Sequence, residues 1–134
     1  MAKIADVEGI GPVYAGKLAK AGVKSTAALL AAGATPKGRK ELAEKAGVDE
    51  GKILEWVNHV DLYRIKGIGS EYSDLLEEAG VDTVVELAQR VPANLLKKME
   101  EANAAKKLVR RLPVLSMVTS WVEQAKKLER VVKY

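Results

Sequence analysis

One sequence motif occurs twice in this chain, 58 residues apart, and this repetition constrains the fold more than any other feature. The first copy, Gly-Ile-Gly at 9–11, runs on to Ala-Gly-Val at 21–23, and the same motif recurs over 67–81. Nine residues between positions 9 and 29 equal their counterparts in the second copy. Self-similarity at a fixed period is the signature of a structural unit that occurs more than once. We therefore expect a duplicated fold.

Residues that start and stop helices recur throughout the chain. Four prolines suit the first turn of a helix, and Gly22, Gly47 and Gly80 suit the left-handed residue that ends one. No strand-like alternation of apolar and polar residues competes with this pattern. The sequence therefore predicts an all-α fold with helices over 3–7, 12–21, 25–32, 36–46, 49–60, 62–66, 70–79, 83–90, 92–102, 104–111 and 114–129.

The chain from Ile4 to Val23 follows the helix-hairpin-helix pattern, in which a Gly-apolar-Gly turn joins two short helices. Glycine permits the positive φ that a tight turn needs, and the small Ala15 lets the two helices approach closely. The backbone N–H groups that open the second helix point outward at its positive dipole end. Such a turn can receive a phosphate group.

The repeat divides the chain into a first helix-hairpin-helix unit over 1–61 and a second over 62–134, the second with basic C-terminal helices. Trp56 and Trp121 are expected to close the cores of the two units. They lie 65 positions apart rather than 58, which places seven extra residues in the second unit, around 106–111. Half of this chain is marginal for an independent core, so we expect the units to pack as one compact helical domain.

Apolar spacing predicts which side chains lie inside. The helix after the first turn is expected to bury Val13, Leu18 and Ala21. Tyr14 and Tyr72 hold the same position in the two copies. Matching positions usually have matching core contacts, so we expect both rings to pack inside rather than to stack on bases.

Four segments of the chain resemble the DUF4332 family, and together they span nearly its whole length. The longest begins Asp-Leu-Tyr-Arg-Ile-Lys-Gly-Ile-Gly and covers 61–90, and the others are 38–43, 53–58 and 108–113. The resemblance implies a compact helical domain with paired hairpins. The family has no assigned function, and its link to DNA rests on its likeness to helix-hairpin-helix proteins.

Charge is distributed unevenly along the chain, whose net charge is +4. Residues 1–61 carry +1, residues 62–86 carry −4 and residues 87–134 carry +7. A phosphate at the second turn would meet the acids that follow it, unless Arg64 and Lys66 compensate, so we expect that turn to be structural. Its acidic surface is expected to face the basic last third of the chain or another molecule. The first turn has only lysines nearby downstream, namely Lys17, Lys20 and Lys24.

A second basic cluster is predicted in the last third of the chain. Lys106, Lys107, Arg110 and Arg111 have the i, i+4 spacing that gathers side chains on one face of a helix. Four cations with no acid among them favour a surface that follows a phosphate backbone.

The sequence offers no chemistry for an enzyme. Cysteine is absent, which excludes disulfides and thiolate sites, and the single histidine, His59, is expected on the surface. We find no nucleophile beside a base, no phosphate loop and no metal-ligand spacing, so we expect no catalytic residue, cofactor or metal. With no long apolar run or signal peptide, we expect a cytoplasmic protein without a membrane partner.

The leading hypothesis is binding of DNA without sequence preference, through the amides of Ile10 and Gly11 and the flanking lysines. The candidate residues are Gly9, Ile10, Gly11, Lys17, Lys20, Lys24, Lys106, Lys107, Arg110 and Arg111. The alternative is a helical module for protein interaction or self-association, in which the hairpins are structural. RNA as the partner, and a cation held by the carbonyls of a hairpin, also stay open.

Overall fold

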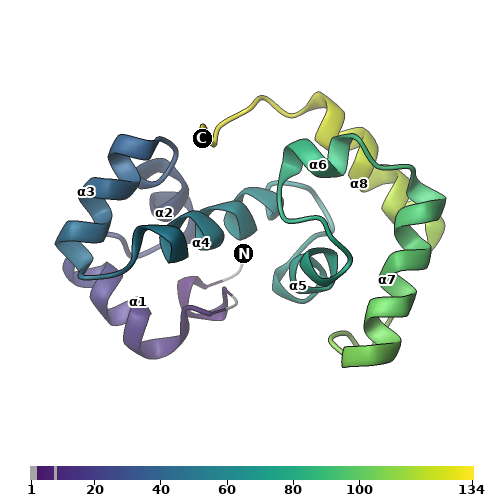
Figure 1. The fold of residues 1–134 in the computed structure, drawn as a ribbon, viewed down its shortest axis with the longest axis horizontal. Coiled ribbons are helices and arrows are strands. Elements are labelled where there is room, and N and C mark those ends of the chain that lie inside the picture. The colour runs from purple at the N-terminus through teal and green to yellow at the C-terminus, as the bar shows by residue number, and fades with distance from the viewer. Residues whose placement is uncertain (1–2, 8) are drawn as a thin grey trace. The chain divides into compact units, whose positions relative to one another are not determined.

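The computed structural model describes residues 3–7 and 9–134, which form helices, turns and loops with no strand among them (Figure 1). The predicted all-α class is thus confirmed. Two units can be distinguished. Unit 1 comprises Met1–Asp61 and Arg130–Tyr134, and unit 2 comprises Leu62–Glu129. The sequence-based division had given residues 130–134 to the second unit.

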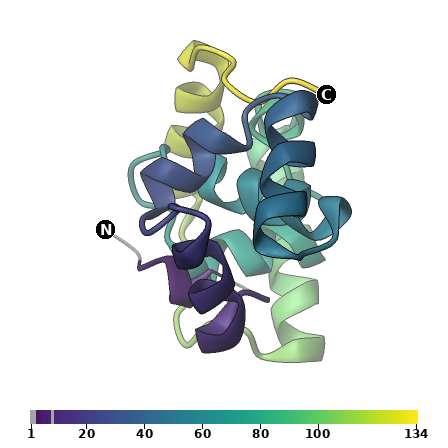
Figure 2. The same ribbon diagram turned by 90° about the vertical axis from the view of Figure 1, so that its left-hand side faces the viewer.

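Unit 1 contains a short 3₁₀ helix and the first four α-helices, which are drawn in purple to teal in Figure 2. Three of the α-helices begin at residues whose side-chain oxygens accept backbone N–H bonds, as N-caps do: Ser25, Thr35 and Asp49. The elements of this unit are η1 Ile4–Asp6, α1 Gly11–Lys20, α2 Thr26–Ala32, α3 Pro36–Ala46 and α4 Glu50–Leu62, whose last residue belongs to unit 2.

Unit 2 contains α5 Ser70–Glu78, α6 Val84–Ala88, α7 Pro92–Lys106 and α8 Leu115–Lys127. Helix α8 packs against α6 and α7, and α5 packs against α7. The predicted helix over 62–66 is wrong, because α4 continues to Leu62 and the chain then turns. In that turn the Ile65 amide donates to the Leu62 carbonyl, and the Ile68 amide donates to the Ile65 carbonyl.

The predicted helix over 104–111 is also wrong. Helix α7 ends at Lys106, and Lys107 has the left-handed conformation, with φ of +52°. Asn103 stabilises this ending because its backbone oxygen accepts from the Lys107 amide and its side-chain oxygen accepts from the Val109 amide. Val109 is buried, so the chain leaves the helix to enter the core of unit 2.

Each unit has an apolar core. The core of unit 1 includes Leu18, Leu29, Ile53 and Val57, and Val132 joins it from the chain's last segment. The core of unit 2 is built around Leu62, Leu75, Leu76, Leu87, Met99, Val118 and Trp121. Val13 is not buried as predicted, because its side chain is 72% exposed at the start of α1.

The last segment of unit 1 is held by a buried arginine. The Arg39 guanidinium donates to the Gly33 carbonyl and to the Lys133 carbonyl, both at 2.8 Å. The Lys133 amide donates to the Ala34 carbonyl at 2.7 Å. Residues 130–134 are therefore tied to the residues after α2 by a main-chain hydrogen bond and to α3 by the side chain of Arg39.

The two Gly-Ile-Gly turns have the same aromatic support. In unit 1, the Tyr14 ring lies 5.1 Å from the Trp56 ring, and in unit 2 the Tyr72 ring lies 5.2 Å from the Trp121 ring. The indole of each tryptophan also lies against the first glycine of its turn. A Cβ atom added to Gly67 would lie 2.8 Å from the indole nitrogen of Trp121. Each tyrosine thus makes the matching contact expected of its position, with a tryptophan of its own unit, and each is half-buried.

Gly67→Ala is expected to destabilise unit 2 strongly. Gly67 has φ of +100°, and a side chain in that conformation costs about 1 to 2 kcal/mol before the clash with Trp121 is added. The matched control is Gly16→Ala, inside α1 with open space around the added methyl, which should stabilise by roughly 0.4 to 1 kcal/mol. Urea denaturation followed by circular dichroism measures both. Equal stability of the two variants would contradict the support of the turn by Trp121.

Candidate nucleic-acid interface

The first turn offers fewer backbone donors than the sequence predicted. Ile10 is buried, and its amide donates to the Val7 carbonyl at 3.0 Å, so this amide is not available to a ligand. Pro12 follows at the second position of α1 and has no N–H. The first turn of a helix lacks internal acceptors, which leaves the amides of Gly11 and Val13 as the donors here.

Lysines from two helices meet beside this turn. The Lys17 ammonium of α1 lies 5.5 Å from the centre of the Tyr14 ring, and the Lys52 ammonium of α4 lies 5.9 Å from it. Sequence reasoning identified Lys17 but missed Lys52, because only the fold brings α4 beside α1. Lys20 and Lys24 are exposed, as a surface role requires.

Val13 distinguishes the first turn from the second. This exposed apolar side chain lies two residues after the Gly-Ile-Gly turn, at the position that Glu71 holds in the second copy. No acidic residue lies in the first turn of α1. Helix α1 therefore contributes apolar and cationic side chains next to the first turn, and no carboxylate.

The predicted basic face of 106–111 does not exist, since these residues do not share a helix. Lys106 pairs with Glu78 of α5 at 3.1 Å, so part of the basic segment faces the acidic helix, as expected. Lys107 is exposed where α7 ends. Arg110 and Arg111 instead lie in the loop between α7 and α8.

Both loop arginines line a pocket beside the second turn. This pocket has a volume of about 450 Å³ and is lined by Gly67, Gly69, Ser70, Glu71, Tyr72, Arg110 and Arg111. The sequence suggested Arg64 and Lys66 as the cations of this turn. However, the Arg64 guanidinium donates to the Glu129 carbonyl at 3.1 Å. Two arginines about forty positions downstream are the cations that reach the pocket.

Side-chain hydrogen bonds hold the walls of this pocket. The Gln124 side chain of α8 accepts from the Lys66 amide at 2.9 Å and donates to the Lys66 carbonyl at 3.2 Å. On the other side, the Tyr72 hydroxyl donates to the Arg111 carbonyl at 3.0 Å. The turn is thus fixed to α8, and the arginine loop is fixed to α5.

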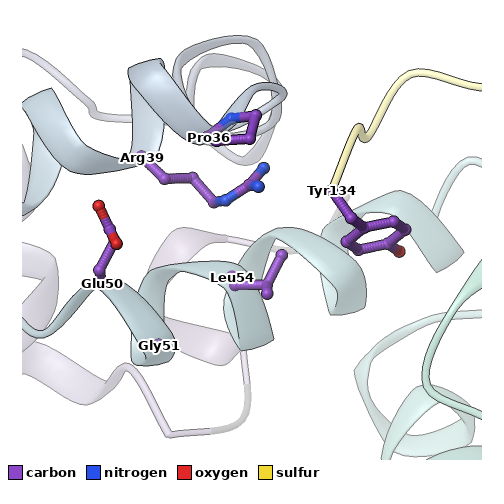
Figure 3. A pocket seen from close by; sticks show the side chains of 6 residues that line it. All are labelled: Pro36, Arg39, Glu50, Gly51, Leu54 and Tyr134. Carbon is purple, nitrogen blue, oxygen red and sulfur yellow. The ribbon is translucent and has the colours of Figure 1, made fainter.

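A second pocket lies within unit 1, between α3, α4 and the end of the chain (Figure 3). Its volume is about 240 Å³, and Arg39 and Tyr134 are among its lining residues. The Arg39 guanidinium already donates to two carbonyls, and the Tyr134 hydroxyl donates to the Asn58 side chain at 3.0 Å. These polar groups hold the chain together, which disfavours a ligand site.

The acidic start of α6 is unsuited to anions. The pKa of Glu86 is raised, first by a hydrogen bond to the Asp82 side chain, then by partial burial and by the charge of Asp82, while Arg90 opposes the shift. Two neighbouring carboxyls therefore already repel each other at this position.

Other candidate chemistry is limited. His59 is buried, so the prediction of a surface histidine is wrong. Within residues 3–7 and 9–134, no three histidine, cysteine or acidic side chains are grouped where they could hold a metal ion. Over the same residues, the structure has no helix with the length and apolar character of a membrane span.

Tyr72→Phe should loosen the arginine loop without disturbing the turn. The variant keeps the ring on Trp121 but loses the hydrogen bond to Arg111, at a cost of about 0.5 to 1.5 kcal/mol. Hydrogen exchange is expected to become faster in residues 107–114. Tyr14→Phe is the matched control and should be nearly neutral, because the Tyr14 hydroxyl has no hydrogen bond within the described residues. An unchanged exchange pattern in Tyr72→Phe would contradict the proposed restraint.

Comparison with known proteins shows a family match over most of the chain. The family model described as a domain of unknown function (DUF4332) matches residues 8–128. No curated protein and no solved structure matches the chain.

Proposed function

We propose that this chain, which belongs to the DUF4332 family, binds the phosphate backbone of DNA without sequence preference through the first turn of unit 1. Phosphate contacts use backbone N–H groups at helix starts and cationic side chains, and they carry no sequence information. The amides of Gly11 and Val13 would supply the first kind of contact. Lys17 and Lys52 would supply the second, with Lys20 and Lys24 at the edge.

The placement of Lys17 and Lys52, from two different helices, around the ring of Tyr14 is the observation that carries this proposal. Two ammonium groups held within 6 Å of the same ring repel each other, and a phosphate between them would relieve that repulsion. The tyrosine itself packs on Trp56, so its role is to position the lysine stems rather than to stack on a base.

We further propose that both units are copies of one helix-hairpin-helix ancestor. The support is the matched contact set, since each copy has a glycine of positive φ against a tryptophan and a tyrosine on the same indole. Only the first copy has lysines and no acid on the helix after its turn. The two turns would therefore have diverged in what they bind.

Lys17→Ala with Lys52→Ala is expected to weaken binding to duplex DNA. Affinity of this kind has a dissociation constant of about 10⁻⁴ to 10⁻⁶ M at physiological salt, so titrations are best made at low salt. Log affinity falls as log salt concentration rises, and each lost phosphate contact makes this slope less steep by about 1. The slope measured for this double variant should therefore be less steep by about 2. Fluorescence anisotropy measures the affinity. Lys40→Ala with Lys45→Ala, which removes two exposed charges from α3, is the control.

A Val13→Glu variant sharpens this test because binding and stability should change in opposite directions. A carboxylate in the first turn of α1 favours the helix dipole by about 0.3 to 1 kcal/mol, yet it repels a phosphate and should weaken DNA binding about three- to fivefold. Equal losses in the two double-lysine variants, together with unchanged binding by Val13→Glu, would overturn the assignment to the first turn.

Self-association is the second candidate function, and an exposed apolar segment favours it. Leu112, Val114 and Leu115 are 37%, 56% and 47% exposed just before and at the start of α8. Apolar groups that gather on a surface mark interaction sites more often than isolated ones do.

If this segment mediates association, light scattering should detect dimers. The fraction of dimer should fall in a Leu112→Ser, Leu115→Ser double variant, and it should not fall when the salt concentration is raised. Association through opposite charges, such as the acids of α5 with the loop arginines of another copy, should instead weaken as salt rises. A monomer at all protein and salt concentrations would exclude both forms.

A further inference from the structure

We propose that the pocket beside the second turn binds the phosphate group of a phosphate ester, with Arg110 and Arg111 as its cationic ligands. This site lies within unit 2 and does not depend on DNA binding by the first turn. Sequence reasoning had set this turn aside because acids follow it. The fold changes that expectation, because it brings two arginines from the α7–α8 loop to the same place.

The first argument is that Arg110 and Arg111 differ from the other arginines in their hydrogen bonds. Each of the other arginines donates to a backbone carbonyl of its own unit: Arg39 to Gly33 and Lys133, Arg64 to Glu129, Arg90 to Gly80 and Arg130 to Val132. Over the described residues, the guanidinium groups of Arg110 and Arg111 have no hydrogen bond or ion pair. Two neighbouring guanidinium groups with unused donors suit bidentate binding of phosphate.

The shape of the pocket is the second argument. Its volume of about 450 Å³ falls within the range of roughly 300 to 1,000 Å³ that small-molecule sites occupy. A single phosphate would fill only part of this space, so room remains for the group to which the phosphate is esterified. We therefore assign the site to a phosphate ester rather than to free inorganic phosphate.

The main chain complements the arginines. Helix α5 begins at Ser70, and the residue before it, Gly69, has no side chain that could accept a hydrogen bond. The N–H groups of the first turn of α5 are therefore not capped by a side chain of Gly69 and can donate to a ligand. The Ile68 amide donates to the Ile65 carbonyl, as the Ile10 amide does to Val7 in the first turn, so it is not available here either. The residue matching Pro12 is Ser70, however, which keeps its N–H group. Gly69, Ser70 and Glu71 all line the pocket, so the start of α5 forms part of its wall.

The walls are rigid enough to hold these donors in place. Gln124 fixes both main-chain groups of Lys66, Trp121 lies against Gly67, and Tyr72 links the indole to the Arg111 carbonyl. A pre-formed site avoids the entropic cost of ordering its groups when a ligand binds.

Glu71 is the opposing charge in this pocket. Glu71 lines the pocket together with the two arginines, so the residues of the pocket carry a net charge of +1. The negative charge of Glu71 should lower the affinity of the pocket for a phosphate without abolishing it. Removing this charge should therefore tighten binding, which can be tested. A damaged fold cannot produce that result.

The experiment is a titration of the full ¹⁵N-labelled chain followed by amide chemical shifts. The probes are inorganic phosphate, adenosine 5′-monophosphate with adenosine as its control, and a short DNA duplex with and without a 5′-phosphate. We expect the amides of Gly69, Ser70 and Glu71 to shift with the monophosphate at lower concentration than with inorganic phosphate, and not with adenosine. A response to the duplex only when it carries a terminal phosphate assigns the source to a phosphomonoester, and an equal response to both duplexes assigns it to the backbone.

Three variants complete the test. Arg110→Ala with Arg111→Ala should weaken monophosphate binding at least about tenfold, and Lys97→Ala with Lys98→Ala, an equal loss of charge on α7, should change it less than about twofold. Glu71→Gln should tighten binding about threefold. Absence of shifts at tens of millimolar monophosphate, or equal binding in the two double variants, would overturn the proposal.

Failure of this proposal can be told apart from failure of DNA binding by the first turn. The Lys17→Ala, Lys52→Ala variant should leave the monophosphate shifts of unit 2 unchanged within about twofold, because its substitutions lie in the other unit.

Discussion

Packing of an indole ring against a glycine of positive φ is the contact on which each turn depends. Gly67 has no room for a methyl group beside Trp121, and Gly9 is nearly as close to Trp56. The same indole supports a tyrosine from the helix that follows. Turn, tyrosine and tryptophan thus form one rigid group, and this group determines where the amides and the nearby cations lie.

Both proposed phosphate sites follow from this support, although they use different cations. In unit 1 two lysine ammonium groups lie within 6 Å of the centre of the tyrosine ring, whereas in unit 2 the tyrosine hydroxyl donates to the loop that carries two arginines. Lysine is a mobile point charge and suits a backbone bound loosely at many positions. Arginine forms a planar fork and suits one phosphate held in a defined pocket. The two turns are similar in construction and differ in the kind of recognition that they favour.

Much of the helical layout could be predicted from the sequence because its determinants are local. Ser25, Thr35 and Thr83 cap helices as their types suggest, and Gly47 ends α3 with positive φ. The residue at which α7 ends could not be predicted from local residue preferences. There, a non-glycine residue adopts φ of +52° because Asn103 and the buried Val109 outweigh its local preference.

The candidate sites were less predictable because charge along a sequence differs from charge in space. Arg110 and Arg111 were grouped with Lys106 by helical spacing, yet a loop separates them and places the arginines beside a turn that seemed too acidic. Lys52 was missed because it comes from another helix. The amide of Ile10 was assigned to a ligand, but an acceptor only three residues away already binds it.

The arginine that holds the last segment of unit 1 has a consequence for how the chain folds. Arg39 and Lys133 are 94 residues apart, so unit 1 is discontinuous in sequence and all of unit 2 lies between its two parts. Because residues 130–134 follow all of unit 2 along the chain, unit 1 gains Val132 and the hydrogen bonds of Lys133 only after unit 2 has been synthesised. The unit whose synthesis begins first is thus also the unit whose last residues are added at the end of this segment.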